Sequence, residues 1–197
     1  MAIRHRKRNP FVKIGILCLA LVMGLGLLNA GYAMWSETLY ISGTVGTGEW
    51  NLGGTPGFWY HWDSHNTYTE EEIEGWLTDI DTDSAWLGAA FAAGEDDSII
   101  GVMEEIFDAG EGGTAEEKFL RHYLAVWLNI CSGRLNLTTV HNVTSISGYS
   151  YLGLATPASA TLSEIIAAIE SKFGTSPTDP EFLIMKDVSD ALNNLLI

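Results

Sequence analysis

The stretch that decides the fold is residues 114–131, TAEEKFLRHYLAVWLNIC. Its large apolar residues recur at intervals of three and four, which places them along one face of an α-helix. Those residues are Phe119, Leu120, Tyr123, Val126, Trp127 and Ile130. Thr114 and Glu117 form a capping box, in which each side chain accepts the other residue's backbone N–H, and Gly133 is a typical helix end. Because such a helix needs other elements to cover its apolar face, the stretch predicts a helical core.

The same pattern recurs on both sides of this helix. Capping boxes at 69–72 and 161–164 open two further helices, and residues 98–109 have helical spacing. A short apolar stretch covers 85–93, and Asp179-Pro180 opens the last helix, because proline is favoured at a first helical position. The expected fold class is mainly α: a compact helical domain of about five to six helices, preceded by a short β segment.

Two segments lack the helical pattern. Residues 36–50 alternate apolar and polar side chains and predict a strand, which the turn cluster NLGGTPG at 51–57 separates from the helices. Residues 134–154 are rich in Thr, Ser, Val and Tyr, which predicts a loop with at most short strands. A solitary strand leaves its backbone groups unpaired. The strand therefore needs a partner, either residues 136–150 of the same chain or a neighbouring subunit.

The N-terminus has the features of a secretory signal. Basic residues from Arg4 to Lys13 precede an uncharged stretch, residues 14–33, which closes with the small residues Gly31 and Ala33. This order predicts cleavage after Ala33. An uncleaved membrane anchor is the alternative, because about 20 helical residues span the roughly 30 Å of a bilayer core.

Both alternatives export the rest of the chain, since basic residues that precede a span stay in the cytoplasm. The expected location is therefore extracellular or at the cell surface. The expected organisation has three parts: a signal peptide or N-terminal anchor over 1–33, an extended strand and linker over 34–53, and the helical domain over 54–197.

The charge of the chain is strongly negative, with 25 acidic residues, 10 Lys and Arg, and a net charge of −15. Half of the basic residues precede Ala33, so the part after it carries a net charge of about −20. Such a field repels nucleic acid and anionic lipid. The expected partners are other surface proteins or further copies of the chain, and a membrane contacts only an uncleaved N-terminal segment.

Two groups of residues are candidate metal ligands. His61, Asp63 and His65 occupy alternate positions, and in an extended segment they would point to one side, where imidazole and carboxylate suit zinc. Packing of the neighbouring aromatic residues is the alternative interpretation.

The second group, Asp79, Asp81 and Asp83, matches the first half of a calcium loop. Ser84 and Ala90 stand where an EF-hand needs Gly and Glu, which excludes that loop type. Asp83 is then expected to cap the following helix, with weak calcium binding as the alternative. No other cofactor is indicated.

Catalytic signatures are absent from the sequence: it contains no H-E-x-x-H, no G-x-S-x-G and no phosphate-binding loop. His122 and His141 have no nucleophile beside them in the sequence. The chain is therefore not expected to be an enzyme, and a secreted hydrolase is the remaining enzymatic alternative. Asn136-Leu137-Thr138 and Asn142-Val143-Thr144 are candidate glycosylation sequons in a polar surface loop.

Two stretches resemble known families. Trp35 to Leu39 and Gly43-Thr44-Val45, directly after the signal, resemble the N-terminus of exported camelysin/TasA-type proteins. That resemblance implies processing by a dedicated signal peptidase, and several members of the family build extracellular fibres.

The remainder resembles a secreted module of prokaryotic surface proteins that opens with T-P-G-F-W or T-Q-G-Y-W. Here the opening is Thr55 to Trp59, and the resemblance continues through Tyr123 to Asn129 and ends at Lys186-Asp187 and Asn193-Asn194. In place of the module's usual Lys-Asn-His after the first Trp, this chain has Tyr60-His61-Trp62. The resemblance implies location and fold, because the module has no established activity.

The sequence as a whole predicts a non-enzymatic exported structural or interaction protein, assembling through its N-terminal strand. The alternative from another class is a calcium- or glycan-binding extracellular module, in which Trp59, Tyr60 and Trp62 would supply stacking faces for a sugar.

Overall fold

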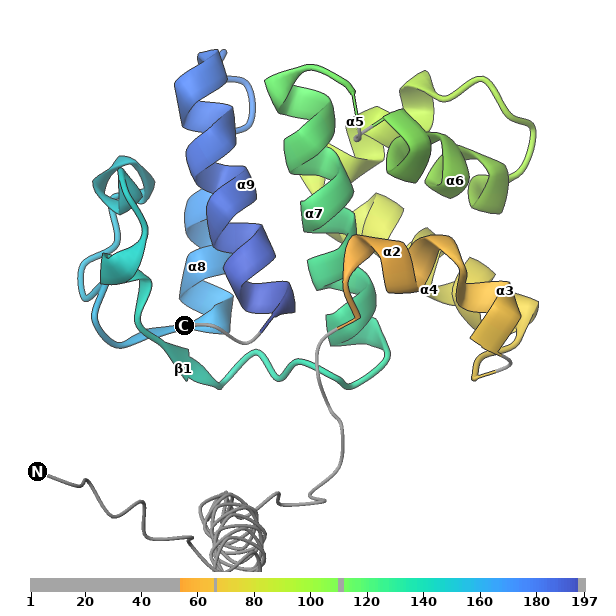
Figure 1. Ribbon diagram of the computed structural model, residues 1–197, viewed down its shortest axis with the longest axis horizontal. Coiled ribbons are helices and arrows are strands. Elements are labelled where there is room, and N and C mark those ends of the chain that lie inside the picture. The colour runs from red at the N-terminus through yellow and green to blue at the C-terminus, as the bar shows by residue number, and fades with distance from the viewer. Residues whose placement is uncertain (1–53, 66, 110–111, 195–197) are drawn as a thin grey trace, which may run out of the picture. The chain divides into compact units, whose positions relative to one another are not determined.

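The computed structural model describes residues 54–65, 67–109 and 112–194. The predicted segments 1–33 and 34–53, with the strand and its pairing, lie outside them. Within the described residues the chain is mainly α, as predicted, with eight α-helices and one two-stranded antiparallel sheet (Figure 1). No helix in this part of the chain is both long enough and apolar enough to cross a bilayer.

The helices are α2 (Pro56–Tyr60), α3 (Trp62–His65), α4 (Glu70–Asp83), α5 (Ala85–Ala93), α6 (Ile99–Ala109), α7 (Ala115–Cys131), α8 (Leu162–Glu170) and α9 (Asp179–Asn193). The strands are β1 (Val140–His141) and β2 (Ala160–Thr161), and the 3₁₀ turns are η1 (Val143–Ser145) and η2 (Tyr149–Leu152). Helices α4 to α9 are the ones that the sequence predicts. The short α2 and α3 are additional, because Pro56-Gly57 starts a helix where a turn was expected.

The helix starts follow the predicted chemistry. In the three predicted capping boxes the Glu carboxylate accepts the backbone N–H of the Thr three residues before it, at 2.6–2.8 Å. A further box opens α9, where Glu181 accepts the N–H of Thr178 at 2.7 Å. These backbone hydrogen bonds lower the pKa of Glu72, Glu164 and Glu181. Local side-chain chemistry therefore sets where the helices begin.

One predicted cap is wrong by a single position. Asp83 is the last residue of α4 and does not cap α5. The cap is Ser84, whose Oγ accepts the backbone N–H of Leu87 at 3.2 Å. Ser84 is buried, whereas Asp83 is exposed, and the smaller hydroxyl suits a junction where two helices meet without an intervening loop.

Helix α7 lies at the centre of the domain. It contacts α2, α4, α5 and α6, and its most extensive contact is with α9, which lies beside it in Figure 1. The buried rings of Phe119 and Tyr123 stack at 5.2 Å between centroids, and Trp86 of α5 meets Phe119 edge-on at 5.4 Å. Each such side chain contributes roughly 1.5–3 kcal/mol by leaving water. The face predicted from residues 114–131 is thus the face that organises the core.

The segment 134–154 is a loop with one short strand, as predicted. Val140 of β1 pairs with Thr161 of β2, and His141 pairs with Ala160. Beyond the sheet, the backbone N–H groups of Leu162 and Ser163 donate to the carbonyl groups of Thr139 and Leu137, each at 2.9 Å. The loop is therefore fixed against the start of α8.

Candidate functional site

Asn129, near the C-terminal end of α7, is fully buried, and both the oxygen and the nitrogen of its side-chain amide form hydrogen bonds. Its Oδ1 accepts the backbone N–H of Gly54 and, at 3.1 Å, the indole N–H of Trp59. Its Nδ2 donates to the carbonyl oxygen of Gly54 and to Oδ1 of Asn193, each at 2.9 Å. An Asn amide can donate two hydrogen bonds and accept two, so every one is satisfied here.

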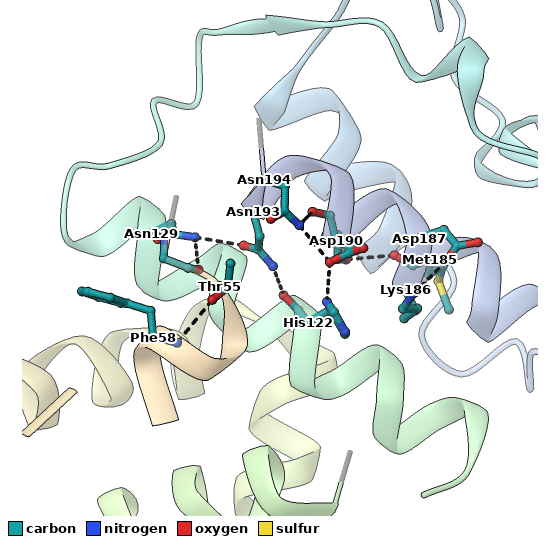
Figure 2. A network of polar contacts seen from close by, with 12 residues as sticks. Thr55, Phe58, His122, Asn129, Met185, Lys186, Asp187, Asp190, Asn193 and Asn194 are labelled. Atoms are coloured by element: carbon teal, nitrogen blue, oxygen red, sulfur yellow. Dashed lines mark hydrogen bonds and ion pairs between the residues drawn. The ribbon is translucent and has the colours of Figure 1, made fainter. Parts of the chain in front are cut away.

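Asn193 extends this arrangement across the central helix pair. It is fully buried on α9, and its Nδ2 donates to the backbone carbonyl oxygen of His122 on α7 at 2.9 Å. Figure 2 shows Asn129, Asn193 and His122 following one another between the two helices. Leaving one buried polar group without a partner costs about 1–3 kcal/mol, so the pair specifies how α7 and α9 align.

Gly54 must be a glycine at this place. A Cβ atom there would lie 2.7 Å from the Phe58 ring and 2.8 Å from Cε2 of Trp59, closer than real contacts allow. Both backbone polar groups of Gly54 are held by Asn129. We name Gly54, Trp59, Asn129 and Asn193 the Gly54 clamp. It fixes the backbone of Gly54, the first residue that the structure describes.

His122 and Asp190 form a polar contact at one end of the clamp (Figure 2). Nδ1 of His122 lies 3.2 Å from Oδ1 of Asp190, which also accepts from Nδ2 of Asn194 at 3.0 Å. Burial lowers the pKa of His122, and Asp190 opposes that effect without reversing it. Burial therefore favours the neutral form of the His122 imidazole.

Arg134 occupies a cluster of aromatic rings beside the clamp. Its guanidinium carbon lies 4.4 Å from the centroid of Phe58 and 5.8 Å from those of Trp59 and Tyr68. Its Nε donates to the hydroxyl of Tyr68 at 2.9 Å. These are cation–π distances, so the ring faces already hold a cation from the chain itself.

This cluster corrects one expectation about sugar binding. Trp59 is fully buried, so it offers no face to a ligand from solvent. Tyr60 and Trp62 are partly buried and remain the accessible members of the predicted aromatic group.

Glu170, at the end of α8, joins three helices. Its Oε1 accepts from the hydroxyl groups of Ser84 and Tyr123, each at 2.6 Å, and its Oε2 accepts the backbone N–H of Ala85 at 3.1 Å. Burial raises the pKa of Tyr123, and the charge of Glu170 adds to that effect. Ser84 is 1% exposed, so a substrate could not reach its hydroxyl, and the group acts as a structural tie between α5, α7 and α8.

The predicted zinc ligands do not line up as expected, because their segment is helical. His61 follows α2, whereas Asp63 and His65 belong to α3. The His65 ring stacks on Phe58, with 4.9 Å between centroids and 6° between planes. Within the described residues, no three His, Cys, Asp or Glu side chains are arranged to hold a metal ion.

Asp79, Asp81 and Asp83 are all exposed residues of α4 and form no loop. Residues i and i+2 of a helix are rotated by about 200° around the helix axis, so Asp81 points away from Asp79 and Asp83. Asp81 instead lines an open hollow of about 300 Å³ with Asp96 and Asp97. There Asp96 accepts the N–H and hydroxyl of Ser98, each at 2.8 Å, and the N–H bond lowers the pKa of Asp96. Calcium binding by these residues stays a prediction.

A second open hollow, of about 250 Å³, lies among α5, α6 and α7. Its walls are mainly alkyl: Ala90, Ala93, Gly94, Ile106, Ala109 and Leu120, with Glu105 and Glu117. Both carboxylates already accept backbone N–H groups, from Glu95 at 3.1 Å and from Thr114 at 2.6 Å. The hollow is smaller than the usual ligand pocket, and one oxygen of each lining carboxylate is already used by a backbone N–H.

The predicted sequon residues Asn136 and Asn142 are both exposed, on the loop that contains β1. Glu170 is not indicated by any sequence pattern, and Asn129 and Asn193 occur only within a resemblance that assigns them no role. For Asn129 a signal exists, since an amide within the apolar run of residues 124–130 must find buried partners.

Comparison of the chain with models of protein families, with curated proteins and with solved structures found no match. The two resemblances noted in the sequence therefore stay predictions.

Proposed function

We propose that this chain is a non-enzymatic, exported structural or interaction protein of the cell surface or extracellular matrix. In this proposal the helical domain is connected to its partners by an N-terminal arm, residues 34–53. The secretory signal and the acidic composition of the exported part support the proposed location.

The observation that carries the proposal is the Gly54 clamp. The arm joins the domain at Gly54, and Asn129 holds both backbone polar groups of that residue. Asn129 also donates a hydrogen bond to Asn193, which lies on α9. A force applied through the arm would therefore act on the central helix pair and not on a frayed end. Such anchorage suits a domain that is held in place by its arm.

The arm supplies the proposed means of association. Leu39 and Ile41 alternate with polar residues, but residues 36–49 contain too few apolar positions to form a sheet alone. Addition of the arm as a strand to the edge of a partner's sheet would supply the backbone hydrogen bonds that a solitary strand lacks. It would also cover the apolar side chains at alternate positions of the arm. The partner is another copy of the chain or a different surface protein.

The test uses the chain as the native host exports it. Mass spectrometry is expected to find an N-terminus at or near Met34, and light scattering with electron microscopy is expected to find assemblies. Ile41→Pro removes a strand donor and should reduce the assemblies to monomers. Leu52→Pro, in the predicted turn cluster, is the matched control and should still assemble. Equal sizes for the wild type and Ile41→Pro would contradict assembly through the arm.

A further inference from the structure

Two exposed asparagines share one local geometry. Oδ1 of Asn136 accepts the backbone N–H of Thr138 at 2.9 Å and its hydroxyl at 2.8 Å. Oδ1 of Asn142 accepts the same two groups of Thr144, at 3.0 Å and 2.7 Å. All four residues are exposed. The two triplets, each Asn-x-Thr, therefore adopt the same turn although they differ in the middle residue.

The geometry leaves the amide nitrogen of each asparagine available. The two hydrogen bonds to Oδ1 fix the orientation of the planar amide, so Nδ2 lies on the side away from the threonine. Among the described residues, Nδ2 of Asn136 and of Asn142 donates no hydrogen bond. Asn129 is the contrast within this chain, because both hydrogens of its Nδ2 are used in the core.

We propose that Asn136 and Asn142 are a pair of N-glycosylation sites, in each of which the threonine holds Oδ1 and leaves Nδ2 of the asparagine exposed to the transferase. The donor class is an oligosaccharide linked through phosphate to a polyprenol lipid. Nδ2 attacks the anomeric carbon, so a C–N bond forms and the C–O bond to phosphate breaks. The electron pair leaves with the lipid phosphate, and a base of the transferase takes the Nδ2 proton.

The position in the fold suits this modification. Leu137 and Val140, beside and between the two asparagines, are 42% and 57% exposed, although both are apolar. The loop itself is fixed to the start of α8 by the hydrogen bonds of Leu162 and Ser163. Glycans on both sides of β1 would cover these apolar side chains without disturbing a packed element, which is one way to protect a short exposed strand.

The test is the intact mass of protein exported by the native host. The chain has no Lys or Arg between Arg134 and Lys172, so a tryptic digest leaves both sites on one peptide. Single variants must therefore separate them. Asn136→Gln and Asn142→Gln are each expected to lose one glycan mass, and the double variant both. Circular dichroism should be the same for all, because both side chains are at the surface.

The threonine variants test the geometry itself. Thr138→Val keeps the shape and the backbone N–H but removes the hydroxyl, and it should abolish the glycan on Asn136 alone. Thr138→Ser keeps a hydroxyl and should retain that glycan. A wild-type mass equal to the bare polypeptide from Met34 would overturn glycosylation and leave the proposed function standing. A chain that is not exported would overturn both.

Discussion

Asn129 of α7 and Asn193 of α9 share a hydrogen bond of 2.9 Å inside the core, 64 residues apart in the sequence. Through this bond the backbone of Gly54 is connected to the last turn of the C-terminal helix. Most of a helix pair's stability comes from apolar contacts that tolerate small shifts. Two buried amides in mutual contact tolerate none, so they select one alignment of α7 on α9.

Replacing Asn129 by alanine should therefore destabilise the protein severely. It would leave the N–H and C=O of Gly54, the Trp59 indole N–H and Oδ1 of Asn193 without their partners. At about 1–3 kcal/mol for each buried group, we expect the free energy of unfolding to fall by at least about 3 kcal/mol. Asn194→Ala is the control, since within the described part of the chain the Asn194 side chain bonds only Asp190, one turn earlier in α9. Urea denaturation that gives the two variants equal stability would contradict the role of the clamp.

Two neighbouring glycines should respond in opposite directions to alanine. Gly54→Ala places a Cβ against Phe58 and Trp59, so we expect the melting temperature to fall. At Gly57, on the exposed side of α2, a Cβ meets only Oγ1 of Thr55 at 4.0 Å. Alanine there should be neutral or stabilise the helix by roughly 0.5–1 kcal/mol. Calorimetry on the exported chain tests both, and a lower melting temperature for Gly57→Ala than for Gly54→Ala would refute the steric argument.

The sequence predicted those features that depend on neighbours along the chain. A capping box such as Thr114 with Glu117 involves four consecutive residues, so its signal is complete in the sequence. Helix α3 was missed because four residues carry no periodicity, and its stacking of His65 on Phe58 forms only in the folded chain. The contact between Asn129 and Asn193 was not predicted either, because neighbouring residues in the sequence do not indicate which buried amides will meet. Ser84 was missed because it follows an acidic residue that is an equally good cap.

Cys131 should react slowly with thiol reagents. It is half-buried at the end of α7, and burial raises the pKa of its thiol to about 11, with Asp79 and Asp83 adding to the effect. Only the thiolate is an effective nucleophile, so at pH 8 the folded protein should react at least about 10-fold more slowly than the unfolded one. Residues 34–197 contain a single cysteine, so in a protein that begins at Met34 the absorbance of a disulfide reagent reports on Cys131 alone. Equal rates with and without urea would contradict this prediction.

His122 should make stability depend on pH on the acid side of neutrality. Its folded pKa lies below the usual value of 6.5, mainly through burial, so the unfolded chain binds the proton first as the pH falls. The groups that face it are Asp190, Asp187 and Lys186 on α9 and Arg121 on its own helix; the two carboxylates oppose the shift and the two cations reinforce it. The stability contribution is therefore fully present above about pH 6.5 and is lost as the pH falls through the folded pKa.

In the variant His122→Gln the free energy of unfolding should depend less on pH in this range, because glutamine keeps a polar side chain and does not titrate. His61→Gln is the matched control, since His61 is exposed and follows α2, outside both α7 and α9. The measurement is the free energy of unfolding in urea at several values between pH 7.5 and pH 5. The slope of stability against pH should be smaller in His122→Gln than in the wild type and unchanged in His61→Gln. An identical slope in all three proteins would show that protonation of His122 is not coupled to folding, and the partly buried contact with Asp190 would then have no influence on acid stability.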